Sequence, residues 1–483
     1  MTNQLCSTGV PGLDEILNGG LPIGQAYLVR GGPGCGKTTL GWHFLTTDAT
    51  EHTNRLFITL GESGEQLARN GRVLGFPTEQ VHILDLTPGA EFFVENLSYD
   101  LFAAAEVEAV PLHEKIIQQV EHLKPDRIFV DSMTQFRYLA ADPYQFRKQA
   151  IAFLRFLTGQ GATVLFTSEG SQEAPDEDLQ FISDGIITLQ LVDNERSVQV
   201  AKLRGGNFGR GHHALRIGHR GLEVFPKLLP QAADGPAIAA KPISAGVPEL
   251  DELLNGGLER GTVTILTGPS GVGKTTLGLQ FIKEAAGRGE RSVVYIFEES
   301  VTTLLDRCEG VNIPVRAMVE RGTLSVIKIE PLTYSPDEFA NLVRVEVEQA
   351  GSRIVMLDSI SGYKLSFRGD ELTRNLHGLC QYLKSRGVTM LLMNEVESIT
   401  GDFRITELGI SYLADNIIFL RYLELRGQLR RAIGVLKKRL SDFEKTLREI
   451  EITRYGIKVG QPLTQLRGIL SGVPEFIKPS NDA

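Results

Sequence analysis

Two glycine-rich segments have the residue types and spacing of a phosphate-binding loop. Both fit the pattern GxxxxGK[ST], over residues 31–38 and 268–275. In such a loop, backbone N–H groups surround phosphate oxygens, the lysine reaches the outer phosphates and the hydroxyl serves Mg²⁺. Two ordinary glycine-rich turns are the alternative. The predicted ATP-binding residues are Gly31, Gly34, Gly36, Lys37, Thr38 and Thr39, and then Gly268, Gly271, Gly273, Lys274, Thr275 and Thr276.

Each loop has an acidic partner at the end of an apolar run. Asp131 ends the run 127–131, and Asp358 ends the run 353–358. A carboxylate at the carboxyl end of a buried strand, beside a phosphate loop, holds Mg²⁺ through water. We therefore predict metal sites made by Asp131 and Asp358 with the hydroxyls of Thr38 and Thr275. A strand-terminating aspartate in a turn is the alternative.

A further acidic position differs between the two halves of the chain. One apolar run is followed by Gly61 and Glu62, and the other by Glu298 and Glu299. A carboxylate facing the γ-phosphate orients or deprotonates a nucleophile, so the three glutamates are predicted catalytic residues. Adjacent side chains on an extended chain point to opposite sides, so Glu298 and Glu299 need not share a role. A solvated acidic turn is the alternative.

The second half also offers hydroxyl groups that the first half lacks. Ser411 and Tyr412 align with Gln180 and Phe181 of the first half. A kinase needs an acceptor hydroxyl and a base, whereas hydrolysis needs only an oriented water. The pattern favours hydrolysis in the first half and self-phosphorylation at Ser411 in the second. An ordinary surface serine is the alternative.

Two basic pairs recur at the same spacing. Lys202 and Arg204 are followed 235 residues later by Lys437 and Arg439. Residues two apart on a strand point to one side, which suits a finger that reaches the γ-phosphate of a neighbouring subunit. Such a finger requires a ring. An exposed basic edge that prevents aggregation is the alternative reading.

The elements that position these residues form a repeat. Residues 9–44 align with residues 246–281 without a gap, so each copy is a whole domain. Apolar runs rich in Val, Ile and Leu alternate with helical stretches, which predicts an α/β fold with a mostly parallel sheet flanked by helices. The predicted strands are 26–30, 55–60, 82–86, 127–131, 163–168, 186–191 and 199–204, and then 262–267, 292–297, 353–358, 389–394 and 416–422.

Domain boundaries follow from the repeat and from composition. We expect one domain over 1–228 and a second over 243–474. The segment 229–242 is rich in Pro, Ala and Gly without periodicity, which predicts a linker. Residues 475–483 are predicted to be a short tail.

Composition excludes several classes of protein. The 483 residues are 42% hydrophobic and 23% charged, as in ordinary globular proteins, and the net charge of −9 argues against nucleic acid as a partner. The four cysteines form no metal-binding or disulfide pattern, which suggests a reducing cytoplasm. Neither a signal peptide nor a membrane-spanning segment is expected.

The motifs together resemble the KaiC family of double-domain RecA-like P-loop ATPases. The resemblance extends from about residue 8 to residue 474 and includes FEES at 297–300, VAKLRGG at 200–206 and the segment from residue 405. It implies an ATP-dependent homohexamer of two stacked rings, with an ATPase in the N-terminal ring. It also implies a Ser/Thr autokinase and autophosphatase in the C-terminal ring. In cyanobacteria such proteins form the core of the circadian clock.

The resemblance also assigns roles to single residues. Glu298 matches the family's kinase base and Glu299 its companion, while Ser411 matches the phosphorylated serine. Tyr412 stands where the clock protein has a phosphorylated threonine, and Gly61 replaces one of two glutamates. The long C-terminal tail that binds KaiA is mostly missing, which argues against KaiA as a partner. Binding of a KaiB-like protein stays open.

Two other functions stay open at the level of sequence. One is a recombinase-like or helicase-like DNA-dependent ATPase, because a RecA-like core does not fix function. The other is a nucleotide-gated scaffold that assembles with ATP and rarely hydrolyses it. Stimulation of turnover by single-stranded DNA distinguishes the first. For the second, Lys37→Ala and Lys274→Ala would abolish the ring, while Glu62→Gln would leave the lifetime of the ring unchanged.

Overall fold

The chain consists of two compact units, Met1–Lys227 and Leu228–Ala483. The computed structural model describes residues 4–48, 53–87, 105–138, 140, 142–171, 175–228, 241–367, 372–396, 410–469 and 474–476. Most of the predicted linker at 229–242 and most of the predicted tail at 475–483 lie outside the described residues. Within the described parts, no helix combines the length and the apolar character that crossing a membrane requires.

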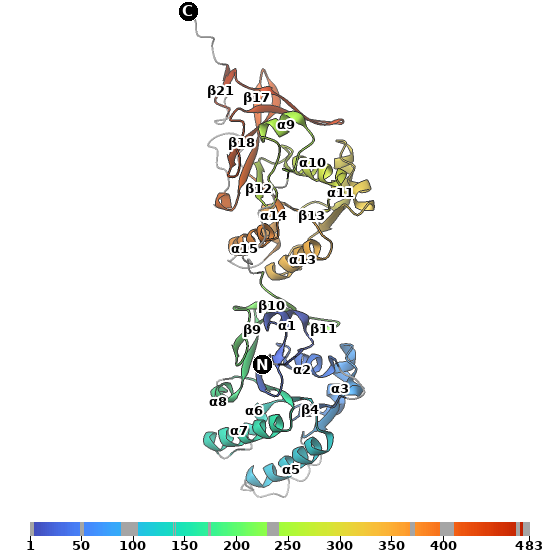
Figure 1. The fold of residues 1–483 in the computed structure, drawn as a ribbon, viewed down its shortest axis with the longest axis vertical. Coiled ribbons are helices and arrows are strands. Elements are labelled where there is room, and N and C mark those ends of the chain that lie inside the picture. Colours follow the sequence, from blue (N-terminus) through green and yellow to red (C-terminus); the bar gives the residue numbers. More distant parts are fainter. Residues whose placement is uncertain are drawn as a thin grey trace, which may run out of the picture. The chain divides into compact units, whose positions relative to one another are not determined.

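The first unit is built on a nine-stranded sheet in the order β11-β10-β9-β8-β3-β7-β6-β4-β5 (Figure 1). Strands β3 to β8 run parallel, and β9, β10 and β11 follow antiparallel. The prediction of a mostly parallel sheet is therefore confirmed. The strands are β3 (Ala26–Arg30), β4 (Arg55–Thr59), β5 (His82–Asp85), β6 (Arg127–Asp131), β7 (Thr163–Ser168), β8 (Gly185–Val192), β9 (Glu195–Leu203), β10 (His213–Gly218) and β11 (Gly221–Phe225).

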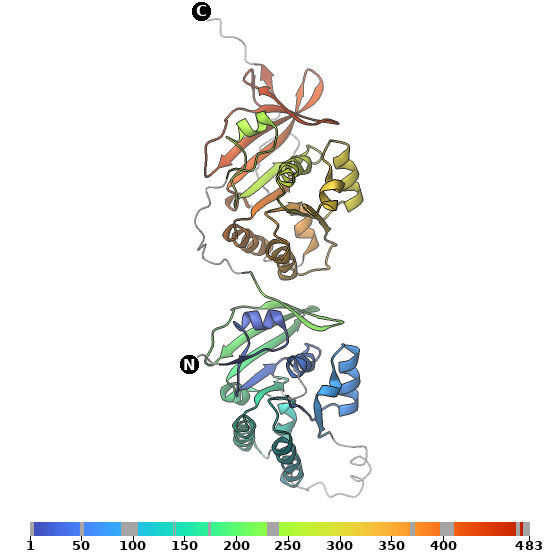
Figure 2. The same ribbon diagram turned by 45° about the vertical axis from the view of Figure 1, so that its right-hand side comes forward.

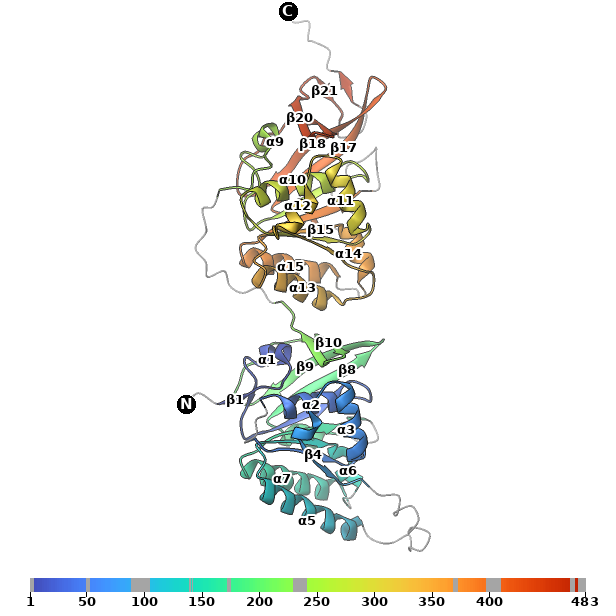
Figure 3. The ribbon, with the colours of Figure 1, turned by 90° about the vertical axis from the view of Figure 1, so that its right-hand side faces the viewer.

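Helices cover both faces of this sheet, which Figure 3 shows with α2 and α3 on one side and α5 and α7 on the other. Each face has its own apolar core. The helices are α1 (Pro11–Ile16), α2 (Lys37–Thr46), α3 (Gly64–Val73), α5 (Ala105–Leu123), α6 (Met133–Tyr138), α7 (Pro143–Gly159) and α8 (Glu177–Ile182), with a 3-10 turn η1 (Thr78–Gln80). A small separate hairpin pairs β1 (Leu5–Cys6) with β2 (Leu21–Pro22).

The second unit repeats the architecture strand for strand, in the order β14-β13-β15-β16-β12-β17-β18-β19-β20. The parallel part contains β12 (Val263–Gly268), β13 (Ser292–Ile296), β14 (Leu324–Lys328), β15 (Ile354–Asp358), β16 (Thr389–Glu395) and β17 (Asn416–Leu425). The antiparallel part contains β18 (Gln428–Lys438), β19 (Arg448–Thr453) and β20 (Gly456–Pro462). Figure 2 shows β17 to β20, coloured orange to red, together at one side of the unit. Segment 439–457 therefore contributes strands to this sheet.

Helices again cover both faces of the second sheet, over two apolar cores (Figure 3). One face carries α9 (Pro248–Leu253), α10 (Lys274–Gly287), α11 (Val301–Glu309) and α12 (Val315–Glu320), and the other carries α13 (Pro336–Glu348), α14 (Ile360–Ser366) and α15 (Leu372–Ser385). The turn η2 (Ile410–Tyr412) precedes β17, and β21 (Leu466–Arg467) pairs with β22 (Glu475–Phe476).

Local sequence explains where two long helices begin. Asp142 accepts a hydrogen bond from the backbone N–H of Gln145, and proline occupies the next position of α7. Ser335 and Glu338 form a reciprocal capping box at the start of α13. Such caps satisfy N–H groups that have no partner within the helix. Helices α7 and α13 thus begin where a side-chain oxygen accepts a hydrogen bond from a backbone N–H of the first turn.

Candidate functional site

Both phosphate loops follow the central strand of their sheet. The loop after β3 leads into α2, and the loop after β12 leads into α10. The last loop residues, Gly36 and Gly273, have φ of +106° and +113°, a backbone region that favours glycine. Each helix begins at the next residue, so its N-terminal N–H groups face the loop. This is the geometry of an anion-binding helix terminus.

The loop lysines are held inside their own loops. Lys37 Nζ donates to the carbonyl oxygens of Gly31 at 2.6 Å and Gly32 at 3.0 Å. Lys274 Nζ donates in the same way to Gly268 at 2.8 Å and to the following proline at 2.9 Å. The two cations therefore occupy equivalent places in the two loops, where a triphosphate would meet them.

Each loop threonine contacts the predicted acidic partner. Thr38 Oγ1 donates to Asp131 Oδ2 at 2.7 Å, and Thr275 Oγ1 donates to Asp358 Oδ2 at 2.7 Å. A hydroxyl and a carboxylate so close together are the hard oxygen donors that Mg²⁺ prefers. The residues present thus fit the metal that accompanies ATP.

The second site is buried enough to shift proton affinities. Burial, with a smaller contribution from the Glu299 charge, raises the pKa of Asp358 to about 6. Burial also lowers the pKa of Lys274, against the opposing charges of Glu395, Asp358 and Glu298. Acidic groups at or just beyond the carboxyl ends of β13, β15 and β16 thus act on one lysine.

The predicted catalytic glutamates lie just beyond β4 and β13, next to the strands that end in the aspartates predicted to bind metal. Glu298 Oε1 accepts a hydrogen bond from Ser359 Oγ at 2.8 Å. Because Gly61 stands at the equivalent position, the first unit has no such carboxylate. Glu62 is therefore the glutamate that the first unit places at this corner of its site.

Sequence reasoning missed two contributors to the sites. Thr167, at the end of β7, donates to the second carboxylate oxygen of Asp131 at 2.6 Å. Glu395 ends β16, pairs in register with Gly268 and lies within electrostatic reach of Lys274. The signal was present, since both follow apolar runs whose carboxyl ends meet at the same edge of a parallel sheet.

An arginine recurs at matching places on the antiparallel strands β9 and β18, and in the first unit it reaches the phosphate loop. Arg196, on β9, donates to the carbonyl oxygen of Gly34 at 3.1 Å. Arg431, at the matching place on β18, stacks over the ring of Tyr422 at 5.7 Å. The Tyr422 hydroxyl lies 3.3 Å from where a side chain on Gly271 would begin. The 235-residue spacing of the basic pairs extends to these arginines, which the sequence analysis did not single out.

The predicted finger residues lie near the amino ends of the parallel strands, whereas the phosphate loop of the same unit follows a carboxyl end. The backbone N–H of Arg204 donates to Asp184, which in turn donates to Ala26, the first residue of β3. Arg439, Asp415 and Val263 repeat this arrangement at the start of β12. The loops follow the other ends of these strands. The structure thus does not bring the basic pairs to the phosphate loop of their own unit.

The lysines of these pairs bind the segment before β8 or β17. Lys202 Nζ donates to the carbonyl oxygens of Gln180 at 2.9 Å and Ser183 at 2.6 Å. Lys437 Nζ donates to the carbonyl oxygen of Ser411 at 3.1 Å. Burial, followed by the neighbouring arginine, lowers the pKa of both lysines. The predicted acceptor serine and the predicted finger therefore share one edge.

Ser411 is half-buried in η2, and the next residue, Tyr412, is 51% exposed. Tyr412 packs edge-on against His377 at 5.6 Å. At the equivalent place in the first unit, Phe181 is 69% exposed. Both units thus present an aromatic side chain here, and the second unit also has the hydroxyl groups of Ser411 and Tyr412.

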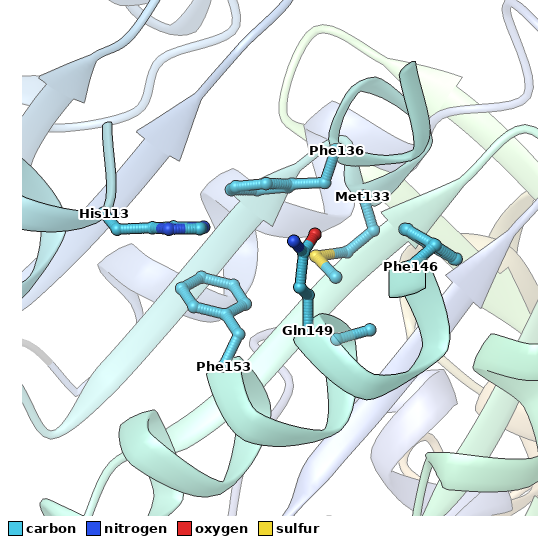
Figure 4. A pocket seen from close by; sticks show the side chains of 7 residues that line it. His113, Met133, Phe136, Phe146, Gln149 and Phe153 are labelled. Carbon is cyan, nitrogen blue, oxygen red and sulfur yellow. The ribbon is translucent and has the colours of Figure 1, made fainter. Parts of the chain in front are cut away.

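A hollow between α5, α6 and α7 of the first unit is not a ligand site. In Figure 4 the side chains of His113, Phe136 and Phe153 point toward one another across it. Its volume of about 10 Å³ is near the minimum for a single water molecule. It is therefore a gap in the packing behind the strand that carries Asp131.

Comparisons with known proteins match nearly the whole chain. The family model described as a KaiC ATPase matches twice, over residues 6–228 and 243–464. A circadian clock oscillator protein KaiC of Prochlorococcus marinus (strain MIT 9313) is 29% identical, covering 99% of this chain and 97% of its own length. The corresponding protein of Parasynechococcus marenigrum is 28% identical over 99% and 94%. Circadian clock protein KaiC3 of Synechocystis sp. is 28% identical over 98% and 95%.

Proposed function

The chain belongs to the KaiC ATPase family, and from this premise we propose that both units hydrolyse Mg²⁺-ATP while the second also phosphorylates Ser411 of a neighbouring chain. The two tandem ATPase domains are a property of the family. The kinase activity, its acceptor and the assembly are the proposed part. ATP is the substrate, and Mg²⁺ the metal, that the two loops would hold.

One observation carries the proposal: the proposed acceptor and the basic pair lie at the amino ends of the parallel strands, whereas the phosphate loop lies at their carboxyl ends. Val263 and Gly268 begin and end β12, and Asp415, four residues after Ser411, bonds to Val263. The five steps from the first to the last of the six residues of β12 span roughly 16 Å, too far for a γ-phosphate to be transferred directly. Transfer within one folded unit is therefore disfavoured, and a second chain must supply either the pocket or the acceptor.

The residues of each pocket have separate tasks in this scheme. The loop lysine and backbone N–H groups bind the phosphates, and Thr275 with Asp358 would hold the metal. When bound, Mg²⁺ neutralises charge that develops on the β- and γ-phosphate oxygens. Glu298, on the Lys274 side of the site, would accept the proton of the Ser411 hydroxyl as its oxygen bonds to phosphorus and ADP leaves. In the first unit, Glu62 would orient water instead.

Assembly follows from the same geometry. We propose a ring, a hexamer by analogy with the family, in which Lys202 and Arg204, or Lys437 and Arg439, approach the nucleotide of the adjacent chain. A ligand bound between chains stabilises the assembled state by mass action. The proposal places the protein in the cytoplasm with a signalling or timing role, and leaves a KaiB-like partner open without including KaiA.

Incubation with Mg²⁺-ATP is expected to add about one phosphate per chain at Ser411, because the proposed base and acceptor occur in the second unit. Intact-mass spectrometry followed by peptide mapping measures this. Ser411→Ala should abolish the added mass, and Tyr412→Phe should retain it. An unchanged mass with active ATP turnover, or phosphate that disappears in Tyr412→Phe alone, would remove Ser411 phosphorylation from the proposal.

A further inference from the structure

The glutamates that occupy matched positions in the two pockets have different partners. Glu62 Oε1 accepts a hydrogen bond from Asn70 Nδ2 at 2.7 Å. Glu299 Oε1 accepts one from Arg307 Nη2 at 2.6 Å. Each partner lies eight residues after its glutamate, on the helix that follows. One pocket therefore pairs its carboxylate with a neutral amide, and the other pairs it with a cation.

In the second pocket, the Glu299–Arg307 ion pair acts electrostatically on Asp358, the aspartate proposed to hold the metal. Glu299 raises the pKa of Asp358 and Arg307 lowers it, so both side chains lie within electrostatic reach of that carboxylate. The side chain of Glu299 is 26% exposed and that of Arg307 is 42% exposed. An ion pair so exposed contributes little stability, so its consequence lies in where it holds the glutamate.

The two kinds of partner have different chemical effects on a carboxylate. A guanidinium donates a charge-assisted hydrogen bond, which competes strongly with a water molecule for the carboxylate oxygens. An amide donates a weaker bond, leaves the charge uncompensated and is displaced more easily. Glu62 is thus the better placed of the two glutamates to orient and deprotonate water.

The second pocket retains another carboxylate for its own chemistry. Glu298 is bound by the Ser359 hydroxyl and acts electrostatically on Lys274, whereas Glu299 acts on Asp358. The two neighbouring glutamates thus serve different sides of the site. Holding Glu299 with Arg307 removes one base while the other stays available.

We propose that Arg307 is a positioning residue that holds Glu299 away from water, so that hydrolysis is suppressed in the second pocket and phosphoryl transfer to a hydroxyl is favoured. Asn70 leaves Glu62 free for hydrolysis in the first. In hydrolysis the water oxygen bonds to the γ-phosphorus, the bond to the ADP oxygen breaks, and the carboxylate takes the water proton. This inference rests on the proposed ATPase and kinase activities.

The first arm of the test uses the full chain with Glu62→Gln, so that turnover comes from the second pocket. Arg307→Asn should then raise kcat for phosphate release roughly 3- to 30-fold with little change in KM, a fraction of what a positioned base supplies. Arg307→Lys should stay near the starting value because it keeps the cation. Arg316→Asn is the matched control. Arg316 lies on α12 and pairs with Asp306 and Glu309, which lie on α11 like Arg307.

The second arm reverses the exchange in the first pocket. In a chain with Glu298→Gln and Glu299→Gln, Asn70→Arg should lower kcat to a similar degree. Opposite changes in the two pockets, at nearly constant KM, are not what a merely structural role produces. Adding Glu299→Gln to Arg307→Asn should erase the gain of the first arm.

The outcomes separate this inference from the proposed function. If the unsubstituted chain releases phosphate but Arg307→Asn leaves kcat unchanged, or raises it equally without Glu299, the inference is overturned alone. If the unsubstituted chain releases no phosphate from ATP, the proposed function fails and the inference fails with it.

Discussion

A chain carrying both Lys37→Ala and Lys274→Ala is expected to lose ATP turnover by at least about a thousandfold, because each pocket loses its charge on the developing phosphate oxygens. Each single variant should keep the turnover of the other unit. Phosphate release under saturating Mg²⁺-ATP measures the effect. Since each lysine bonds within its own loop, the substitution also relaxes that loop, which adds to the loss.

Lys283→Ala is the matched control for this pair. Lys283 lies on α10 like Lys274, but its ammonium group bonds to the carbonyl oxygen of Asn312 at 3.1 Å on the surface. Its removal should leave turnover within about twofold, as for most surface substitutions. Persistent turnover in the double variant would show that ATP is hydrolysed elsewhere, and the two-pocket model would be wrong.

The central part of each sheet was predictable because its strands are buried on both faces. Runs such as 127–131 and 353–358 are almost wholly apolar, and the structure makes them β6 and β15. Strand β14 and the antiparallel strands β10, β11, β18, β19 and β20 were not predicted. Strands β10 and β19 alternate apolar with polar or charged residues, and the expectation relied on continuous apolar runs.

The candidate site divides along a similar line. The loop residues follow a motif whose spacing is local, and the aspartates end apolar runs typical of buried strands, so sequence patterns placed both at the site. The Arg307 pairing with Glu299 depends on a helix turning back toward its preceding strand, and no motif encodes it. The contribution of Glu395 depends on which strand lies next to β12, which is a property of the sheet order. The order of the strands and individual side-chain pairings are therefore what sequence patterns left undetermined.

The register of the strands explains why the basic pairs could be recognised but not assigned a pocket. Two cations spaced by one residue suggest a common direction, whatever strand they occupy. Pairing Lys202 with Ile186 and Lys437 with Ile417 puts them near the amino ends of the parallel strands. This placement distinguishes basic residues that would reach the pocket of another chain from residues that would reach the pocket of their own chain.

Phosphate is expected to move between chains, so two inactive variants should restore each other when mixed. A Lys274→Ala chain keeps Ser411 but lacks a competent second pocket, and a Ser411→Ala chain has the pocket but no acceptor. Mixed assemblies should label the Lys274→Ala chain at least about tenfold above either variant alone, since transfer needs near contact between hydroxyl and γ-phosphate. Labelled ATP with mass-tagged chains measures which partner carries the phosphate.

The geometry of β12 makes the direction of this result specific. Ser411 lies near the Val263 end of the strand and Lys274 follows the Gly268 end, so one unit cannot present both to the same nucleotide. A mixture of two Ser411→Ala preparations controls for labelling at other sites. Label on Ser411 of the Lys274→Ala chain without its partner would contradict transfer from another chain's second pocket. If the mixture carries no label while the unsubstituted chain labels itself, transfer between chains is contradicted. The reaction would then take place within a single unit, which must open to bring its own Ser411 to the nucleotide.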